Sequence, residues 1–224
     1  MAKVPIPGQV KTRLLPFLDE EASAQLYACF LRDMAEAVEA AFPGLCRVAY
    51  TPPGEGERLR GLVPPGCPLI PQRGAHLGER LFNLFHHFLL AEGLDGALAV
   101  NSDSPTLPMG RVAEAFARLE EPGVDGVLGP AEDGGYYLIG LTKPHKHLFA
   151  DIPWSTPEVL RATLERATEA RLHLVLLEPW YDVDDRAALR RLWQELQGAG
   201  SGRQAPATRV YLEKLHTEGR LEAL

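Results

Sequence analysis

Apolar positions along the chain recur with two periods, and the two periods alternate. Over 20–42 the residues Leu26, Phe30 and Met34 follow one another at a spacing of four, which predicts a long helix with one buried stripe. Helical spacing returns in a segment that begins near Gly78 and in four later ones: 109–119, 157–170, 185–196 and 205–219. Short β-type runs fill the intervals, at 45–50, 67–71, 96–100, 125–128, 136–141 and 172–177. This alternation predicts an α/β fold whose mostly parallel sheet is covered by helices on both faces.

The length of the chain favours one domain. The sequence has 224 residues and no internal repeat, which is a common size for a single α/β domain. The loose stretch 197–206 is rich in glycine and polar residues and precedes the helical segment 205–219. We therefore expect one domain over 1–224, with this stretch as a linker inside it.

The charge balance narrows the range of partners. Lys and Arg total 23 against 30 Asp and Glu, so the formal net charge is −7. An acidic chain is not drawn to nucleic acid by its bulk charge. A phosphorylated small molecule would instead need a local group of cations, a metal ion, or both.

Cysteine usage and hydropathy indicate a cytoplasmic protein. Cys29, Cys46 and Cys67 are far apart and form no Cys-x-x-Cys pair, which argues against a zinc knuckle and against a disulfide framework. No apolar run approaches the ~20 residues that a membrane-spanning helix needs, and the first residues lack the apolar core of a signal peptide. We expect neither membrane insertion nor secretion.

The opening AKVPIPGQVKTRL gathers cations around helix-breaking residues. Lys3, Lys11 and Arg13 stand close to Pro5 and Gly8, before the first predicted helix. Glycine lets backbone N–H groups approach an anion, while Lys and Arg supply charge and a planar fork for phosphate oxygens. The segment is a candidate phosphate-binding loop, and a solvated basic terminus remains the alternative.

The segment NSDSPTLP places Asp103 directly after the apolar run 96–100. A carboxylate at the end of a strand suits Mg²⁺ or Mn²⁺, because these hard cations take oxygen ligands and share them with phosphate and water. Asp103, Ser104 and Thr106 also precede the predicted helix 109–119, so helix capping is the alternative role.

The segment GPAEDGGYYLIGL joins an acid to two glycines. Asp133 precedes Gly134 and Gly135, and the apolar run 136–141 follows. The glycines would allow a ligand to approach the backbone close to the carboxylate. Asp-Gly-Gly is also a common hairpin turn, so the segment is either a ligand-binding loop or a structural turn.

Two further segments follow the same logic. In PWYDVDDRAAL, one of the acids could complete a metal site, while Asp184 or Asp185 is expected to cap the next helix. In IPWSTPEVL, Ser155 and Thr156 predict a helix start with Pro157 at the first helical position.

Six segments taken in order resemble a known family. They are AKVPIPGQVKTRLLP, HLGERL, NSDSPTLP, GPAEDGGYYLIGL, LFADIPWSTPEVL and WYDVDDRAAL, and together they extend over about 1–196. The sequence resembles the uncharacterised glycosyltransferase-A-like family of the nucleotide-diphospho-sugar transferase superfamily, some members of which are named arsenosugar biosynthesis glycosyltransferases. The resemblance implies a Rossmann-like three-layer α/β/α sandwich with a mostly parallel central sheet.

The resemblance also implies roles for individual residues. The positions matching nucleotide-binding motifs are Lys3, Pro5, Gly8, Lys11, Thr12, Arg13, Gly78, Glu79 and Arg80. The positions expected to face the sugar or acceptor are Asp133, Gly134, Gly135, Tyr136, Trp154, Ser155 and Thr156. Asp103 would hold Mg²⁺ or Mn²⁺, with Asp182 or Asp184 as a second ligand, and Lys11, Arg13 and Asp133 would act in catalysis.

Two departures from the family pattern matter. Members carry an apolar strand before the AK-x-P-x-PG motif, yet here Met1 directly precedes Ala2, so we expect that strand to be missing. Asp103 is followed by Ser104 and Pro105 instead of forming Asp-x-Asp, a pattern nearer to nucleotidyltransferases. We expect transfer of a sugar from a nucleoside diphosphate to a small acceptor. Nucleotidyl transfer with pyrophosphate release, or nucleotide binding without catalysis, are the alternatives.

Overall fold

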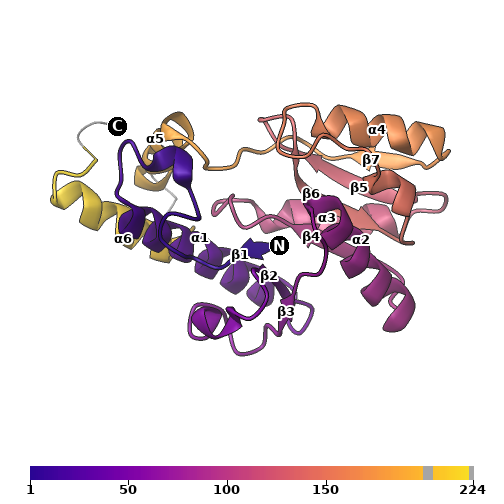
Figure 1. The fold of residues 1–224 in the computed structure, drawn as a ribbon, viewed down its shortest axis with the longest axis horizontal. Coiled ribbons are helices and arrows are strands. Elements are labelled where there is room, and N and C mark those ends of the chain that lie inside the picture. The colour runs from indigo at the N-terminus through magenta and orange to yellow at the C-terminus, as the bar shows by residue number, and fades with distance from the viewer. Residues whose placement is uncertain (199–203, 222–224) are drawn as a thin grey trace. The chain divides into compact units, whose positions relative to one another are not determined.

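The computed structural model describes residues 1–198 and 204–221, and the chain in it divides into two compact units (Figure 1). Three separate stretches build unit 1: Met1–Pro71, Ser102–Leu107 and Asp182–Leu224. Unit 2 consists of Gln72–Asn101 and Pro108–Tyr181. Residues 199–203 of the predicted linker lie outside the described residues. The prediction of one domain over 1–224 stays a prediction.

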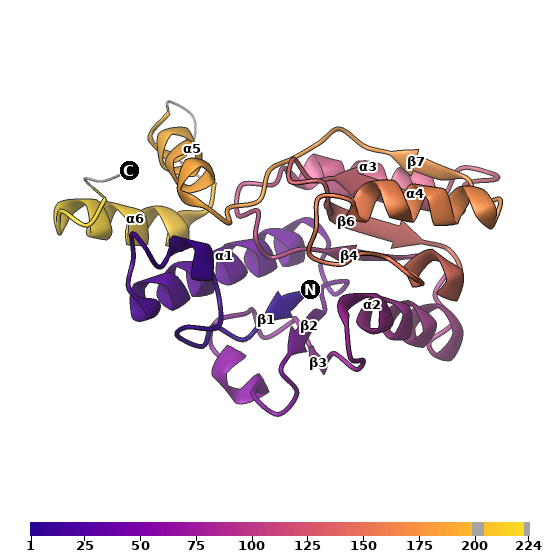
Figure 2. The same ribbon diagram turned by 45° about the horizontal axis from the view of Figure 1, so that its top comes forward.

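Unit 1 contains a three-stranded parallel sheet in the order β1-β2-β3. Its strands are β1 (Ala2–Lys3), β2 (Val48–Thr51) and β3 (Leu69–Pro71), and its helices are α1 (Glu20–Ala41), α5 (Arg186–Gln197) and α6 (Pro206–Thr217). Short 3₁₀ turns cover Thr12–Leu14 and Gly56–Leu59. The core under the sheet joins the strands to the second half of α1 through Leu31 and Ala35, and α6 packs along α1 (Figure 2).

Unit 2 contains a four-stranded sheet in the order β4-β6-β5-β7. Its strands are β4 (Ala97–Val100), β5 (Gly126–Pro130), β6 (Tyr136–Leu141) and β7 (Leu174–Leu176), and its helices are α2 (Leu77–His86), α3 (Met109–Leu119) and α4 (Val159–Glu169). A π-helical turn, His87–Ala91, continues α2, and a 3₁₀ turn covers Lys146–Phe149. Helix α3 packs on β5 and β6.

The predicted α/β class with mostly parallel strands is confirmed. Three of the five strand pairings among the described residues are parallel, and β6 runs antiparallel to both of its neighbours. The reason for the exception is the short connection 131–135, which can form a hairpin but is too short for the crossover that parallel strands need.

A first strand is present, but it lies within the AK-x-P-x-PG motif and not before it. Ala2 and Lys3 pair in parallel with Tyr50 and Thr51 of β2, and the Val4 N–H donates to the Thr51 carbonyl at 2.8 Å. Two residues are therefore enough to attach the following loop to the sheet.

The helices with predicted bounds begin and end within two residues of those bounds, and α4 starts two residues later than expected. Pro157 is not its first residue, because Ser155 adopts a positive φ of 66° and the Thr156 hydroxyl donates to the Pro153 carbonyl at 2.7 Å. These contacts hold the chain in a turn until α4 begins at Val159. Among the described residues, no helix combines the length and the apolar character that crossing a membrane requires.

Candidate functional site

Lys11 is the centre of a charged cluster in unit 1. It adopts a left-handed conformation with φ 49° immediately before the 3₁₀ turn Thr12–Leu14, which turns its side chain into the unit. Only 2% of that side chain is exposed. The rings of Tyr27 and Phe30, both from α1, lie 5.5 and 5.4 Å from the ammonium nitrogen. A cation in such apolar surroundings is stable only if opposite charge compensates its lost hydration.

Two carboxylates supply that compensation. The Lys11 ammonium donates a short hydrogen bond to Asp103 Oδ1 and a second one, of 2.8 Å, to Asp184 Oδ1. The Asp103 and Asp184 side chains are 33% and 40% exposed, so both remain partly accessible to solvent. The Val183 N–H donates to the Asp103 carbonyl at 2.9 Å and holds the two acidic segments together.

The electrostatics of the cluster favour the charged forms of Lys11 and Asp184. Burial by itself would lower the pKa of Lys11, but the charges of Asp103 and Asp184 outweigh it and raise that pKa above its ordinary value. Burial likewise opposes ionisation of Asp184, yet the charge and hydrogen bond of Lys11, helped by Arg13 and Lys3, hold its pKa below the ordinary value.

Two exposed cations lie beside the buried one. Arg13 Nη1 is 4.0 Å from Asp184 Oδ2, and 66% of the Arg13 side chain is exposed. Lys3 is exposed at the end of β1 and is close enough for its charge to lower the pKa of Asp184. The charges of three cationic side chains, Lys11, Arg13 and Lys3, thus act on Asp184 in a chain whose net charge is negative. A protein with a negative net charge needs such a local group of cations if it is to bind a phosphorylated molecule.

Tyr27 braces the cluster and was not singled out from the sequence. It is buried, its hydroxyl shares a 2.7 Å hydrogen bond with the Ser102 hydroxyl, and it accepts the Lys3 N–H at 2.9 Å. These contacts join α1 to β1 and to the segment that carries Asp103. The only signal in the sequence is a polar-tipped aromatic next to the apolar stripe of the helix, which is common in ordinary cores.

The remaining residues of the candidate phosphate loop lie between β1 and Lys11. Gly8 has a φ of 75°, and a Cβ added there would lie 3.2 Å from the carboxylate of Glu20. Pro5 is half-buried, whereas Thr12 is exposed at the start of its 3₁₀ turn. The loop therefore presents Thr12 and Arg13 to solvent and turns Lys11 inward.

The two carboxylates that contact Lys11, Asp103 and Asp184, do not act as the N-caps of the helices that follow them. Helix α3 begins after Pro108 without a side-chain cap, so the capping role considered for Asp103, Ser104 and Thr106 is wrong. Asp185 caps α5 by accepting the Ala188 N–H at 2.9 Å, which leaves Asp184 to pair with Lys11. Asp182 is half-buried one residue before Val183.

Asp133, Gly134 and Gly135 form the turn of the β5–β6 hairpin in unit 2. The exposed Asp133 accepts the Gly135 N–H at 2.8 Å, and the Gly134 N–H donates to the Ala131 carbonyl at 3.1 Å. Tyr136 follows as the first residue of β6 and packs with Trp154 against the start of α4. The structure thus shows that Asp-Gly-Gly forms a hairpin turn.

The predicted residues around α2 also make contacts within unit 2. Gly78 packs so tightly on Trp154 that a Cβ would lie 2.7 Å from the indole ring. Glu79 accepts the Ala75 N–H at 2.8 Å, and Arg80 donates to the Gly74 carbonyl at 3.0 Å. The structure therefore gives Glu79 and Arg80 a shared part in shaping the loop before α2.

Known proteins place this architecture in a family. A family model described as "Uncharacterized protein conserved in bacteria (DUF2064)" matches residues 34–156. The crystal structure of a candidate nucleotide-diphospho-sugar transferase from Desulfovibrio desulfuricans G20 is 30% identical, with a TM-score of 0.87, and the match covers 99% of this chain and 94% of that one.

A more distant structure shares the fold alone. CMP:2-keto-3-deoxy-manno-octonic acid synthetase, in complex with CTP, is 15% identical with a TM-score of 0.51, over 85% of this chain and 94% of the other. No curated protein gives a match. The chain belongs to the DUF2064 family and has the fold of the structure from D. desulfuricans, which confirms the resemblance found in the sequence.

Proposed function

We propose that this protein is a metal-dependent transferase that takes a sugar from a nucleoside diphosphate and passes it to a small acceptor. The observation that carries the proposal is the buried Lys11 ammonium between Asp103 and Asp184, with Arg13 and Lys3 beside it. The 30% identity to a candidate nucleotide-diphospho-sugar transferase over nearly the whole chain supports it.

The chemistry of the acidic pair fits Mg²⁺ or Mn²⁺. Asp103 and Asp184 direct oxygens at one cationic nitrogen and are partly exposed, and carboxylate oxygens are the ligands that a hard cation takes. Asp103 and Asp184 would be the ligands, with Asp182 as a third. When bound, such an ion would neutralise charge on the diphosphate of the donor.

The cations of unit 1 would bind and stabilise the diphosphate. The exposed fork of Arg13 can contact two phosphate oxygens at once, and Lys3 adds a point charge. Lys11 is fixed by its two carboxylates and would offer a positioned positive charge where negative charge develops on the leaving group. Backbone N–H groups near Gly8 and Thr12 complete the candidate phosphate loop.

The residues of unit 2 that match the family motifs also receive proposed roles. Asp133 is an exposed carboxylate on a short turn, so it can act as the base that takes a proton from the acceptor. Gly134, Gly135, Tyr136, Trp154, Ser155 and Thr156 are the proposed surroundings of sugar and acceptor. Gly78, Glu79 and Arg80 are proposed for the base and ribose of the nucleotide.

Binding titrations test the nucleotide site. The full chain is titrated with nucleoside diphosphates, nucleoside triphosphates and nucleotide sugars, with and without Mn²⁺. We expect Arg13→Ala to weaken binding by about tenfold, the loss that one charged hydrogen bond represents. Arg190→Ala, at an exposed position of α5, is the matched control and should bind as the unaltered chain does. Absence of nucleotide binding in the presence of metal would refute the proposal.

Product analysis decides the reaction. Consumption of a nucleotide sugar, with release of the nucleoside diphosphate, supports the proposal. We expect Asp103→Asn to abolish the metal dependence of that release and Asp133→Asn to slow turnover while nucleotide binding persists. Pyrophosphate release from a nucleoside triphosphate and a phosphorylated acceptor would assign nucleotidyl transfer instead.

A further inference from the structure

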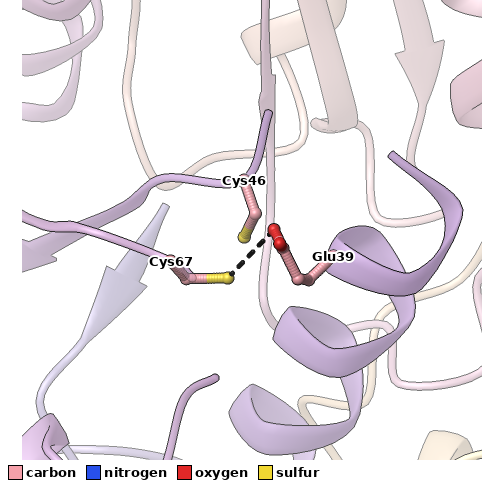
Figure 3. A group of neighbouring side chains, drawn as sticks. All are labelled: Glu39, Cys46 and Cys67. Atoms are coloured by element: carbon pink, nitrogen blue, oxygen red, sulfur yellow. Dashed lines mark hydrogen bonds between the residues drawn. The ribbon is translucent and has the colours of Figure 1, made fainter. Parts of the chain in front are cut away.

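A second cluster of ligand-type side chains lies in unit 1, away from the carboxyl ends of its strands. Cys46 precedes β2 by two residues and Cys67 precedes β3 by two residues. Because the parallel register pairs Val48 with Leu69, the two cysteines stand at matching positions before their strands. Glu39 reaches the same point from α1 (Figure 3).

The three side chains converge on a small volume. One ligand atom from each residue, a sulfur or a carboxylate oxygen, lies within 4.8 Å of the other two. The Cys67 thiol donates to Glu39 Oε2 at 3.7 Å, and both cysteines are buried. Figure 3 shows both sulfurs and the carboxylate turned toward one another from three separate segments.

Backbone groups hold the carboxylate in this position. Glu39 Oε1 accepts the Gly44 N–H at 3.1 Å, so one oxygen is anchored while Oε2 faces the thiols. On its other side the carboxylate packs over Gly66, where an added Cβ would lie only 2.7 Å from Oε1. The side chain is thus confined by two backbone segments, at Gly44 and at Gly66.

We propose that Glu39, Cys46 and Cys67 form a binding site for a thiophilic divalent metal ion of the Zn²⁺ type. Two sulfurs and a carboxylate oxygen are ligands that Zn²⁺ prefers, and tetrahedral coordination separates such ligands by roughly 3.5–4 Å. From the 4.8 Å limit, the distances between ligand atoms need to shorten by at most about 1.3 Å. One coordination position remains for a water or an external ligand.

The site would be chemically distinct from the acidic pair at Lys11. Thiolates select Zn²⁺ and related ions, whereas the oxygen-only ligands Asp103 and Asp184 suit Mg²⁺ or Mn²⁺. A metal at Cys46 and Cys67 would tie the amino ends of β2 and β3 to α1, so its effect should be on the stability of unit 1. The inference stands independently of the proposed transferase function.

Metal titration of the full chain under reductant tests the site. We expect one equivalent of Co²⁺ to bind with a thiolate-to-metal charge-transfer absorption, to be displaced by Zn²⁺, and to raise the midpoint of thermal unfolding. Cys46→Ser and Cys67→Ser should each weaken Zn²⁺ binding by about tenfold or more, and Glu39→Gln should weaken it less. Cys29→Ser is the matched control, because Cys29 lies outside the cluster, and should bind normally.

A measurement on the unaltered chain removes the risk that a variant simply misfolds. Alkylation of the three cysteines is followed by mass spectrometry with and without Zn²⁺. We expect Zn²⁺ to slow modification of Cys46 and Cys67 while the rate at Cys29 is unchanged. No bound metal, binding without a thiolate absorption, or equal protection of all three cysteines would overturn the proposal.

Discussion

Lys11 stays charged while almost fully buried, because neighbouring side chains compensate the hydration that its ammonium has lost. Its ammonium has exchanged water for two carboxylates and the faces of two aromatic rings. Removing one carboxylate leaves a buried charge with less compensation, so stability and pH dependence report directly on this arrangement.

Asp184→Asn is predicted to destabilise the protein by about 1–2 kcal/mol at neutral pH. This is less than the loss of a fully buried pair, because Asp184 is 40% exposed and Asp103 still contacts Lys11. The pKa of Asp184 is lowered in the folded state, so its contribution is present above the unfolded value of 3.8 and is lost as pH falls below it.

Urea unfolding at several pH values measures this contribution. The difference between Asp184→Asn and the unaltered chain should be constant from about pH 5 to 8 and should shrink below pH 4. Asp95→Asn, at an exposed carboxylate of unit 2, is the control and should show no such pattern. A difference that persists unchanged at pH 3 contradicts the prediction.

The sequence identifies the members of the cluster as candidate site residues, but it does not predict that they contact one another in the fold. Lys11, Asp103 and Asp184 each stood in a short polar segment that followed an apolar run or a glycine. The hydrogen bonds that join them span 92 and 173 residues, and no local pattern encodes such contacts. The inward turn of Lys11 depends on one left-handed residue, which composition does not indicate.

At the scale of elements, the β5–β6 hairpin depends on its two glycines in different ways. Gly134 has a φ of 91°, and a Cβ there would lie 2.1 Å from the Pro157 carbonyl oxygen. Its own carbonyl accepts the Leu160 N–H at 2.9 Å, near the start of α4. Gly135 has no positive φ, and its Cβ would meet only Asp133 Oδ1 at 3.2 Å.

Gly134→Ala is therefore predicted to destabilise the protein by about 2 kcal/mol or more, whereas Gly135→Ala should cost clearly less. The reason is that the first change combines an unfavourable φ with a clash against backbone, while the second meets one movable side-chain oxygen. Thermal unfolding of the two variants side by side measures the difference. Equal midpoints would show that the turn relaxes at little cost.

The elements themselves were largely predictable, and the exceptions have local causes. Strand β6 and helix α3 have the predicted bounds, because periodicity and turn residues agree at their ends. Strand β2 is displaced toward Thr51, because pairing with β1 and β3 sets its register and apolar content does not. The antiparallel direction of β6 follows from the short β5–β6 connection, and the alternation of helices and strands does not indicate it.

At the scale of the whole molecule, unit 1 is assembled from segments distant in the sequence, and a buried carboxylate joins two of them. Asp33 of α1 accepts the Ala207 N–H at 2.9 Å and the Thr208 N–H at 2.8 Å. Because these N–H groups lie in the first turn of α6, Asp33 acts as a helix cap supplied from 174 residues away. Sequence periodicity places both helices but does not reveal this bond.

Asp33→Ala is predicted to loosen α6 from α1 and to destabilise unit 1 by about 1–3 kcal/mol, since two buried N–H groups lose a charged acceptor. Hydrogen exchange should accelerate about tenfold or more at the amides of α6, while β5 and β6 in unit 2 keep their protection. Glu36→Ala is the matched control, because it removes an exposed carboxylate from the same helix. If exchange rises equally in both units, Asp33 contributes to global stability and its role as a local clamp for the last helix is wrong.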